Sequence, residues 1–532
     1  MKKLLICVFL FSILFTSCSG FLDEYSTDQR YCKTANDLNL LMVGQGFLGV
    51  YQPSISSQVT MDKTFLASAD NNSMHFPWLH LMDDDAEAFL QDYVTPDQGT
   101  PYYMLSAMAN WSTNPCSNVQ SQQWNDTQWT KLYACIGVIN SIIYQGENLK
   151  GKDPKEETLL DHICGEAYFL RAFYYFYLAN VYGLPYSPAT ASQDFSVPLK
   201  TSPNVEDKYF TRSSNQEVYN QIWSDLKSAE QYIGSYTPDS KLRVGIGAIK
   251  ALQSRVALYM EKYQDAIDAS NAFNNLSYSL TDLRAFDNTT NFLGRSSKEV
   301  IFTVGGNITA AVFINDSVSA WNGDDDRASS FKASNDLMEK YNSNDLRRKV
   351  FFKESSVNHA PLPNKYKTWR TYNDPELVSD IFCIRYSEVV LNKAEALAMM
   401  GKIDDARTTL QNLRANRIIG AQLNDIPTDQ KQLVDFIRTE RRLELCFEGH
   451  RWFDLRRYSV NSKYPLPADF TIKHPAYTYD ANSKVNFLTG YYVLQSYRKD
   501  QGAWVVPVPS ATIEFNRGSI TNLIRNNRSI IK

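Results

Sequence analysis

Apolar positions spaced at three and four residues recur along much of this chain and predict a mostly helical protein. The clearest run lies between residues 154 and 182, where Ile163, Ala167, Leu170 and Tyr174 follow the helical period. A second apolar face on the same segment predicts a central and largely buried helix. Further helices are expected over residues 34–51, 126–149 and 215–233.

Two distant segments share one pattern of a helix, a tight turn and a second helix. They span residues 245–273 and 384–414, and a shift of 140 positions aligns Lys262 with Lys402. This pattern resembles tetratricopeptide helix pairs, which stack on one another into a solenoid. A chance pair of amphipathic hairpins is the alternative.

Two long stretches break the helical pattern and read as loops. Residues 52–125 and 275–380 contain Pro, Gly, Asn, Asp and Ser throughout. We expect short helical pieces in the first stretch and a strand over residues 300–304 in the second. The chain from about residue 458 onward reads as polar and irregular. Loops of this length in a compact protein are usually functional or disordered.

The first residues predict export and attachment to a membrane. Two lysines precede an apolar run from Leu4 to Phe15, which is too short to span a bilayer, and small polar residues then lead to Cys18. Residues 1–17 resemble a bacterial lipoprotein signal, in which Cys18 is acylated and residues 18–33 form a tether. An ordinary cleaved secretory signal is the alternative. No later stretch approaches 18 consecutive apolar residues, so we predict no membrane-spanning helix.

Composition excludes several classes of function. Without the two lysines of the signal, 52 basic side chains face 58 acidic ones, and no basic run suggests a nucleic-acid partner. The six cysteines after Cys18 form no CxxC pair, and buried free thiols are favoured over disulfides, which stay open as the alternative. The chain contains no HExxH, Gly-x-Ser-x-Gly or phosphate-loop motif, so we expect no catalytic residue, metal site or cofactor.

Four blocks of sequence resemble the SusD-like (RagB/SusD) glycan-binding lipoproteins of Bacteroidetes. They are GEAYFLRAFYYF (165–176) closing with YGLP (182–185), IRYSEVVLNKAEA (384–396) ending in LRANR (413–417), ERRLELCFEGHRWFDLRR (440–457), and VPVP (506–509) with Glu514 and Asn516 after it. Their order and spacing fit the family over essentially the whole mature chain. Similar proteins usually finish with Gln-Asn-Pro-Gly, whereas this chain has Ile524-Arg525-Asn526-Asn527, which leaves the packing of the tail open.

The resemblance implies a single domain over residues 34–532. Its fold would be mostly α, a right-handed superhelix of four tetratricopeptide-like helix pairs with a loop-rich, partly β ligand-binding part. The helical scaffold would lie mainly at 34–51, 126–273 and 380–457, and the ligand-binding insertions at 52–125 and 275–380.

The resemblance also implies a function. It describes an outer-membrane lipoprotein, facing the cell exterior, that captures an oligosaccharide or polysaccharide and delivers it to a SusC-like TonB-dependent transporter. Because the family binds rather than cleaves glycans, we do not expect an enzyme. The alternatives are a surface glycan-degrading enzyme and a protein-interaction scaffold that does not bind sugar.

Aromatic side chains in the loop-like stretches are the best candidates for sugar contact, because the apolar face of a pyranose packs on a flat ring. The candidate rings are Trp78, Tyr102, Tyr103, Trp111, Trp321 and Trp369, with Asn72, Asp83, Asn322 and Arg327 as polar companions. Packing of each ring within its own loop is the alternative. The acidic runs 83–85 and 324–326 could bind a calcium ion; the alternative is that their charges are simply solvated.

One cluster of glutamates has a spacing that could indicate a catalytic site. Glu440, Glu444 and Glu448 are spaced by four residues and would share a helix face. Two of them could form an acid/base pair for glycoside cleavage. The alternative, which the resemblance favours, is a structural network with the neighbouring arginines. Interhelical ion pairs are expected also for Glu166, Arg171, Arg385, Glu388 and Glu395.

Overall fold

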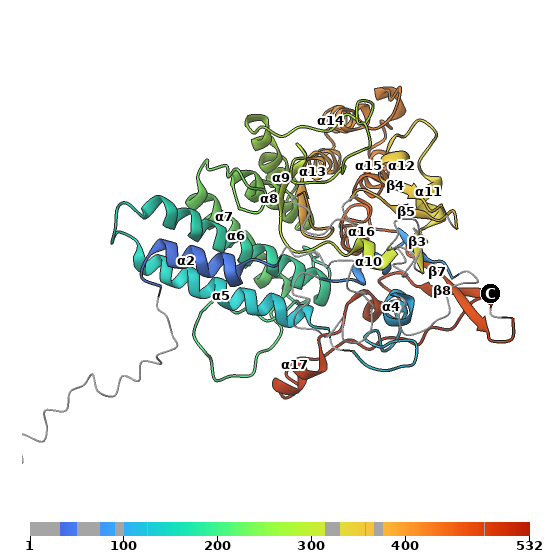
Figure 1. The fold of residues 1–532 in the computed structure, drawn as a ribbon, viewed down its shortest axis with the longest axis horizontal. Helices are drawn as coiled ribbons and strands as arrows, with labels where there is room; N and C mark the ends of the chain where they lie inside the picture. Colours follow the sequence, from blue (N-terminus) through green and yellow to red (C-terminus); the bar gives the residue numbers. More distant parts are fainter. Residues whose placement is uncertain are drawn as a thin grey trace, which may run out of the picture.

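The protein divides into a helical part and a part rich in loops and short strands (Figure 1). The computed structural model describes residues 32–49, 75–90, 101–124, 126–313, 330–356, 358–366, 376–483 and 485–532. The signal peptide, Cys18 and most of the tether lie outside these residues. The mostly helical fold that the sequence predicts is confirmed. The handedness and number of repeats of a superhelix stay predictions.

Long helices occupy the left and top of Figure 1. Their bounds are α2 (Ala35–Leu41), continued by the π-helix η2 (Met42–Gly46), α5 (Gln128–Leu149), α6 (Glu157–Tyr182), α7 (Asn215–Ile233), α8 (Ile246–Tyr259), α9 (Tyr263–Asn271), α13 (Tyr386–Met399), α14 (Ile403–Ala415), α15 (Gln430–Leu445) and α16 (Arg451–Ser459). The first helix is shorter than predicted, because the chain passes into a π-turn and leaves helical geometry at Phe47.

Side-chain caps fix where two of these helices begin. Ser214 accepts a hydrogen bond from the backbone of Glu217, whose carboxylate accepts one in return from Ser214 N–H. Thr34 and Asp37 form the same reciprocal box before α2. Each box satisfies backbone donors that the first helical turn leaves free. This local chemistry explains why α7 begins at the predicted residue.

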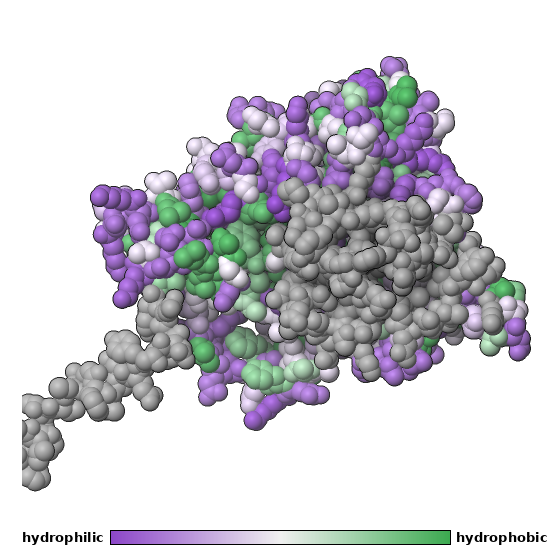
Figure 2. All heavy atoms as spheres, viewed as in Figure 1, coloured by the Kyte–Doolittle hydropathy of each residue, from purple (hydrophilic) through white to green (hydrophobic). Residues whose placement is uncertain are grey.

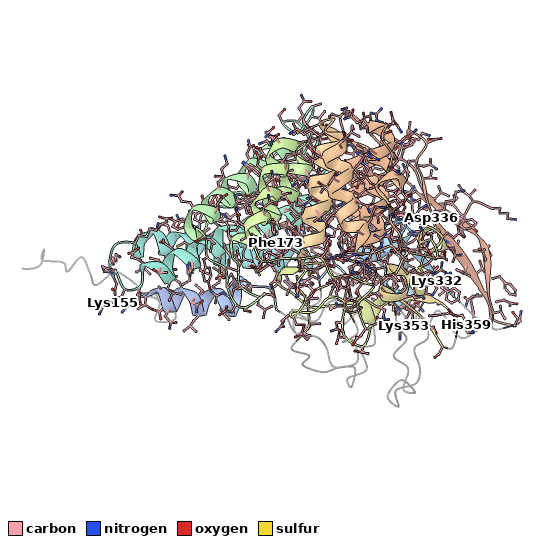
Figure 3. All side chains as sticks on the ribbon, turned by 90° about the horizontal axis from the view of Figure 1, so that it is seen from above. Lys155, Phe173, Lys332, Asp336, Lys353 and His359 are labelled. Carbon is pink, nitrogen blue, oxygen red and sulfur yellow. The ribbon has the colours of Figure 1, made fainter. Side chains whose placement is uncertain are left out.

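Helix α6 is the centre of the fold. Almost every residue from Ile163 to Tyr182 is buried, and Phe173 lies near the middle of the molecule in Figure 3, while Lys155 marks one end of the helical part. The Phe173 ring contacts Phe302 and Phe382 edge-on or tilted, both from the loop-rich part. The prediction of a helix buried on most sides is confirmed.

The two predicted helical hairpins share one turn geometry. Lys262 and Lys402 precede α9 and α14 with nearly identical backbone angles, φ −85° and ψ 68° against φ −81° and ψ 68°. The residue before each lysine has positive φ, namely Glu261 at 57° and Gly401 at 77°. The hairpins therefore repeat in three dimensions as well as in sequence.

Gly401→Ala tests that turn. We expect an unfolding free energy lower by about 1 kcal/mol, because a Cβ disfavours positive φ. The matched control is Gly137→Ala, since Gly137 lies inside α5 with nothing within 4 Å of an added Cβ. That change should raise the unfolding free energy by about 1 kcal/mol. Urea unfolding of both variants measures the effects, and two shifts of the same sign would contradict this account of the turn.

Apart from one hairpin near the C-terminus, the remaining helices and strands of the described chain are short, and most of them lie in the loop-rich part. They are η3 (Leu79–Leu81), β1 (Ala86–Ala88), α4 (Pro101–Ala109), η4 (Ala272–Asn275), β2 (Val300–Thr303), α10 (Thr309–Phe313), β3 (Phe331–Ala333), α11 (Asn335–Glu339), α12 (Arg347–Val350), β4 (Phe352–Glu354), β5 (Pro361–Pro363), β6 (Cys383–Arg385), η7 (Leu423–Asp425), η8 (Gln501–Trp504) and α17 (Ser510–Phe515). The strands pair antiparallel as β1–β3, β2–β6 and β4–β5. The predicted strand near residue 300 and the short helical pieces are confirmed.

The C-terminal region corrects the sequence prediction. Instead of irregular chain after residue 458, two long strands form an antiparallel hairpin, β7 (Ile472–Asp480) and β8 (Val485–Leu494). A bulge between Ala476 and Tyr477 shifts the register. The hairpin stands at the right of Figure 1, with the C-terminus beside it. The exposed positions of the hairpin include Phe487, Leu488 and Tyr491 as well as Lys473 and Thr478, so apolar and polar residues do not alternate cleanly along the strands.

The cysteines and the surface agree with the sequence interpretation. All six described cysteines are free, and Cys135, Cys164, Cys383 and Cys446 are buried as predicted. Over the described residues, no helix is both long and apolar enough to cross a bilayer. Figure 2 shows mostly hydrophilic outer helices and a hydrophobic patch around α2, where Leu40 is exposed.

Candidate functional site

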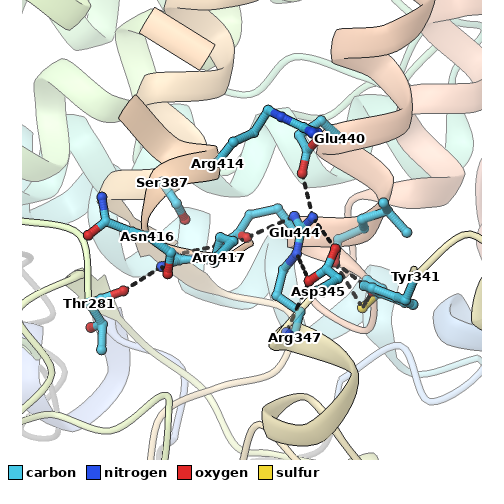
Figure 4. Close-up of polar contacts among 12 residues, drawn as sticks. Thr281, Tyr341, Asp345, Arg347, Ser387, Arg414, Asn416, Arg417, Glu440 and Glu444 are labelled. Carbon is cyan, nitrogen blue, oxygen red and sulfur yellow. Dashed lines mark hydrogen bonds and ion pairs between the residues drawn. The ribbon is translucent and has the colours of Figure 1, made fainter. Parts of the chain in front are cut away.

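The glutamates of the acidic cluster are structural partners of arginines. Glu444 accepts a hydrogen bond from Arg417 Nε (2.9 Å) and a longer one of 3.3 Å from Arg347 (Figure 4). Arg385 Nη1 also donates to Glu444, at 2.7 Å. Glu448 accepts from both Arg385 Nε (2.6 Å) and Lys365 Nζ (2.5 Å). These side chains are almost completely buried.

Electrostatics at this cluster oppose acid/base catalysis. Burial alone would raise the pKa of Glu444, but the charges of Arg417 and Arg385 hold it well below its usual value of 4.5. The pKa of Glu448 is lowered as well, by Arg385 and Lys365 against burial. A general acid for glycoside cleavage needs a raised pKa. The geometry therefore supports the structural interpretation of the cluster.

The other predicted ion pairs join helices across the scaffold. Arg171 of α6 binds Asp225 of α7, and Arg255 of α8 binds Glu388 of α13 through two bonds of 2.6 and 2.7 Å. In the same way Glu395 of α13 accepts from Arg457 of α16. Glu166 differs, since its partner Arg243 precedes α8 in a loop. These forks fix helix positions and contain no free group for ligand.

The acidic run 83–85 is also held by arginines. The three carboxylates lie within 4.8 Å of one another. Asp84 pairs with Arg451 (2.7 Å) and Asp85 with Arg442 (2.7 Å). Burial raises the pKa of Asp83 well above its usual value, and its Oδ1 accepts a hydrogen bond from Asp85 N–H. Positive charge is thus already supplied to this cluster by the protein.

A polar groove of about 530 Å³ lies between α4, the following loop and the β7–β8 hairpin. Four tyrosines line it: Tyr102, Tyr477, Tyr479 and Tyr492. The carboxamides of Asn110, Asn118, Asn486 and Asn527 and several serines line it too. We call this site the tyrosine groove. Flat rings beside amide and hydroxyl groups are the chemistry that a sugar needs, a surface for its apolar face and partners for its hydroxyls.

The rings of the tyrosine groove are anchored but partly exposed. Tyr102 stands on α4, where its backbone N–H donates to Ser330 Oγ and its ring packs against Phe331. Tyr477 and Tyr492 are half-buried, on opposite strands of the hairpin. Burial raises the pKa of both hydroxyls, so they are neutral and can donate hydrogen bonds.

The C-terminal tail forms one wall of the tyrosine groove. Half-buried Arg525 donates to the carbonyl oxygens of Ser112 (2.8 Å), Gly502 (3.1 Å) and Val505 (2.9 Å). A side chain at Gly502 would collide with the Ile524 carbonyl, so only glycine permits this close approach. The tail that departs from the usual family motif is therefore held to the groove wall through Arg525, although Ile524, Asn526 and Asn527 expose their side chains.

Three of the predicted sugar-contacting rings belong to the core instead. Trp78, Tyr103 and Trp111 are 1%, 3% and 0% exposed. Trp111 donates from Nε1 to the Met82 carbonyl (2.9 Å) and stacks on a histidine ring 4.3 Å away. The expectation that loop-like sequence presents these rings to solvent does not hold, because the loops fold over a core of their own. Buried Asp83 likewise has no open position for a ligand.

Tyr102 is the one predicted site residue that lines the tyrosine groove. The remaining candidates, Asn72, Trp321, Asn322, Arg327 and Trp369, lie outside the described residues. The sequence interpretation missed Tyr477, Tyr479 and Tyr492, which stand in the unpredicted hairpin. The alternation of Tyr477 and Tyr479 before a polar turn was the available signal for a strand.

Other cavities fit a sugar less well. A crevice of about 540 Å³ beside α15 and α16 is lined by Arg442, Arg451, Asp84 and Asp336, which pair with one another. A more apolar cleft of about 690 Å³ beside η2 and α5 has Phe47 as its single aromatic lining residue, and two of its polar side chains, Lys131 and Arg243, are cationic. Of these three cavities, only the tyrosine groove combines several aromatic rings with a lining of mostly uncharged polar groups.

Comparison with known proteins identifies relatives of this chain. The SusD family model matches residues 103–527. Two SusD-like proteins of Formosa agariphila are 26% and 24% identical over 386 and 397 residues, which is 62% and 66% of this chain and 71% and 75% of theirs.

Solved structures share the same fold. A SusD superfamily protein of Bacteroides thetaiotaomicron superposes with a TM-score of 0.64 at 20% identity, covering 92% of this chain and 99% of that one. A protein of Bacteroides vulgatus described as a putative sugar binding protein gives 0.65 at 19% identity, covering 93% and 99%. With the family match spanning most of its length, this chain belongs to the SusD family.

Proposed function

We propose that this protein captures an oligosaccharide or polysaccharide at the cell surface and delivers it to a SusC-like TonB-dependent transporter. The observation that carries the proposal is the tyrosine groove, in which four half-buried or nearly buried rings meet carboxamide side chains within a SusD-family fold. The description of one structural relative as a sugar binding protein supports it. The pairing of every glutamate in the acidic cluster supports binding over cleavage.

The proposal places the protein on the outer membrane, facing outward, with lipid on Cys18 and residues 18–33 as a tether. Residues that line the tyrosine groove would hold the glycan, with Tyr102 among them. Trp321, Trp369, Asn72, Asn322 and Arg327 are proposed as further contacts from the second and first insertions. Delivery would follow from movement of the tethered body relative to the transporter.

Native affinity electrophoresis tests the binding step. The full-length protein, solubilised in detergent, is run through gels that contain members of a panel of soluble polysaccharides. We expect at least one glycan to retard the wild type, and Tyr477→Ala and Tyr492→Ala to remove most of that retardation by deleting the sugar platform. Trp321→Ala probes the second insertion in the same gels.

Tyr144→Ala is the matched control, because Tyr144 is 58% exposed on α5, outside the groove. It should be retarded like the wild type. Circular dichroism checks that each variant is folded. Retardation of the Tyr477 and Tyr492 variants equal to that of the wild type would refute the tyrosine groove as the site.

A further inference from the structure

The tyrosine groove contains almost no net charge. Among the described residues that line it, Arg528 alone is ionisable with a charge at neutral pH. Its guanidinium forms an ion pair with Asp500, and the two side chains are only 8% and 2% exposed. All other lining groups are tyrosine rings, carboxamides, hydroxyls and apolar side chains. Among the described lining residues, a ligand therefore meets hydrogen-bonding groups and no unpaired charge.

Charged groups near the margin are also occupied. The Asp480 carboxylate at the end of β7 accepts hydrogen bonds from Asn482 N–H (3.0 Å) and Ser483 Oγ (2.8 Å). Glu87 of β1, whose charge acts on Tyr477, pairs with Lys332 at 2.9 Å. Among the described residues, the margin thus adds paired charge and the Asp480 carboxylate, and the Arg525 guanidinium in the groove wall is bonded to three backbone carbonyl oxygens.

We propose that the tyrosine groove selects neutral glycans over sulfated or uronic-acid glycans. The inference rests on the proposed function and specifies the substrate class of the same site. Hydroxyl groups of a neutral pyranose can exchange water for carboxamide and tyrosine partners at little cost. A sulfate or carboxylate that enters the groove loses its water without gaining an opposite charge, and unpaired burial of an ion is strongly unfavourable.

Matched pairs of polysaccharides test the selection. The probes are dextran against dextran sulfate, hydroxyethyl cellulose against carboxymethyl cellulose, and laminarin against sulfated laminarin. The full-length protein is titrated by affinity electrophoresis at two salt concentrations, so that general repulsion is screened at the higher one. For each backbone that binds, we expect the anionic member to bind at least about tenfold more weakly at both concentrations.

A variant that adds a positive charge to the groove should gain binding, and a gain of binding cannot be caused by misfolding. Thr478 is exposed on β7 and lines the groove. Thr478→Arg should increase retention by the anionic member of the pair several-fold, because it supplies the missing counter-charge. Thr408→Arg, at an exposed position of α14, adds the same charge elsewhere and should leave the preference unchanged.

The outcomes separate the two claims. Binding of the anionic member as tight as that of its neutral partner overturns the selection while leaving glycan capture intact. Equal effects of the two arginine variants overturn it as well, because the charge of the groove would then be irrelevant. Failure of every probe and every panel glycan to bind would refute the proposed function itself.

Discussion

Replacing Arg385 with alanine should lower the unfolding free energy by about 3–5 kcal/mol, because it leaves buried carboxylates without their partner. Arg385 donates to Glu299 (2.9 Å), Glu444 (2.7 Å) and Glu448 (2.6 Å), and it is 1% exposed. Water that entered the vacated space could supply hydrogen bonds but no positive charge to the carboxylates. The three glutamates come from two distant parts of the chain, so the loss should loosen the contact between scaffold and loop-rich part.

Chemical unfolding followed by circular dichroism measures this effect. Arg284→Ala is the control, since Arg284 pairs with Asp282 at the surface, where the side chains are 58% and 35% exposed. Exposed pairs contribute little, so its unfolding midpoint should stay close to that of the wild type. If Arg385→Ala shifts the midpoint no further than this control, the network is not what holds the two parts together.

Cys18→Ala should move the protein from the membrane fraction to the soluble fraction. The prediction follows from the resemblance of residues 1–18 to a lipoprotein signal. A thioether-linked diacyl anchor with a further acyl chain holds a protein far more firmly than one chain does.

Cell fractionation with immunoblotting measures the shift. Cys32→Ala is a suitable control, because Cys32 is a free cysteine at the start of the described chain and no lipid is expected on it. That variant should stay with the membranes. Persistence of the Cys18→Ala protein in the membrane pellet after a high-salt wash would show that something other than the lipid anchors it.

Helices could be predicted from sequence where local signals define them. The apolar period and the Ser214–Glu217 capping box lie within a few residues, and α7 was placed correctly. The motif that contains Lys262 in one hairpin and Lys402 in the other likewise predicts a tight turn, because the geometry of such a turn depends on residues next to one another in sequence. Element type follows from such short-range patterns, because the hydrogen bonds of a helix are local.

The groove could not be predicted because its parts are distant in sequence. Tyr102 and Tyr492 meet only after the β7–β8 hairpin has packed beside α4. Exposure of a ring is also a tertiary property. Trp111 stands in a loop-like segment, yet it finds a carbonyl partner at Met82 and a ring partner at His474 in the core.

The acidic cluster shows an intermediate case. The sequence indicated that Glu440, Glu444 and Glu448 would pair with arginines, and they do. The partners, however, are mostly outside the block, such as Arg417 at the end of α14 and Lys365 in the loop-rich part. Spacing along one helix defines which side chains lie on the same side of that helix, but it does not identify the residues of other elements that pair with them.

The most direct test of glycan capture is calorimetric titration of the full-length protein with the neutral glycan that retards it most. We expect the Tyr477→Ala/Tyr492→Ala double variant to bind about 100-fold more weakly, with each ring contributing roughly tenfold. Tyr144→Ala should retain the wild-type dissociation constant. A double variant that binds the glycan as tightly as the wild type would contradict the assignment of the tyrosine groove.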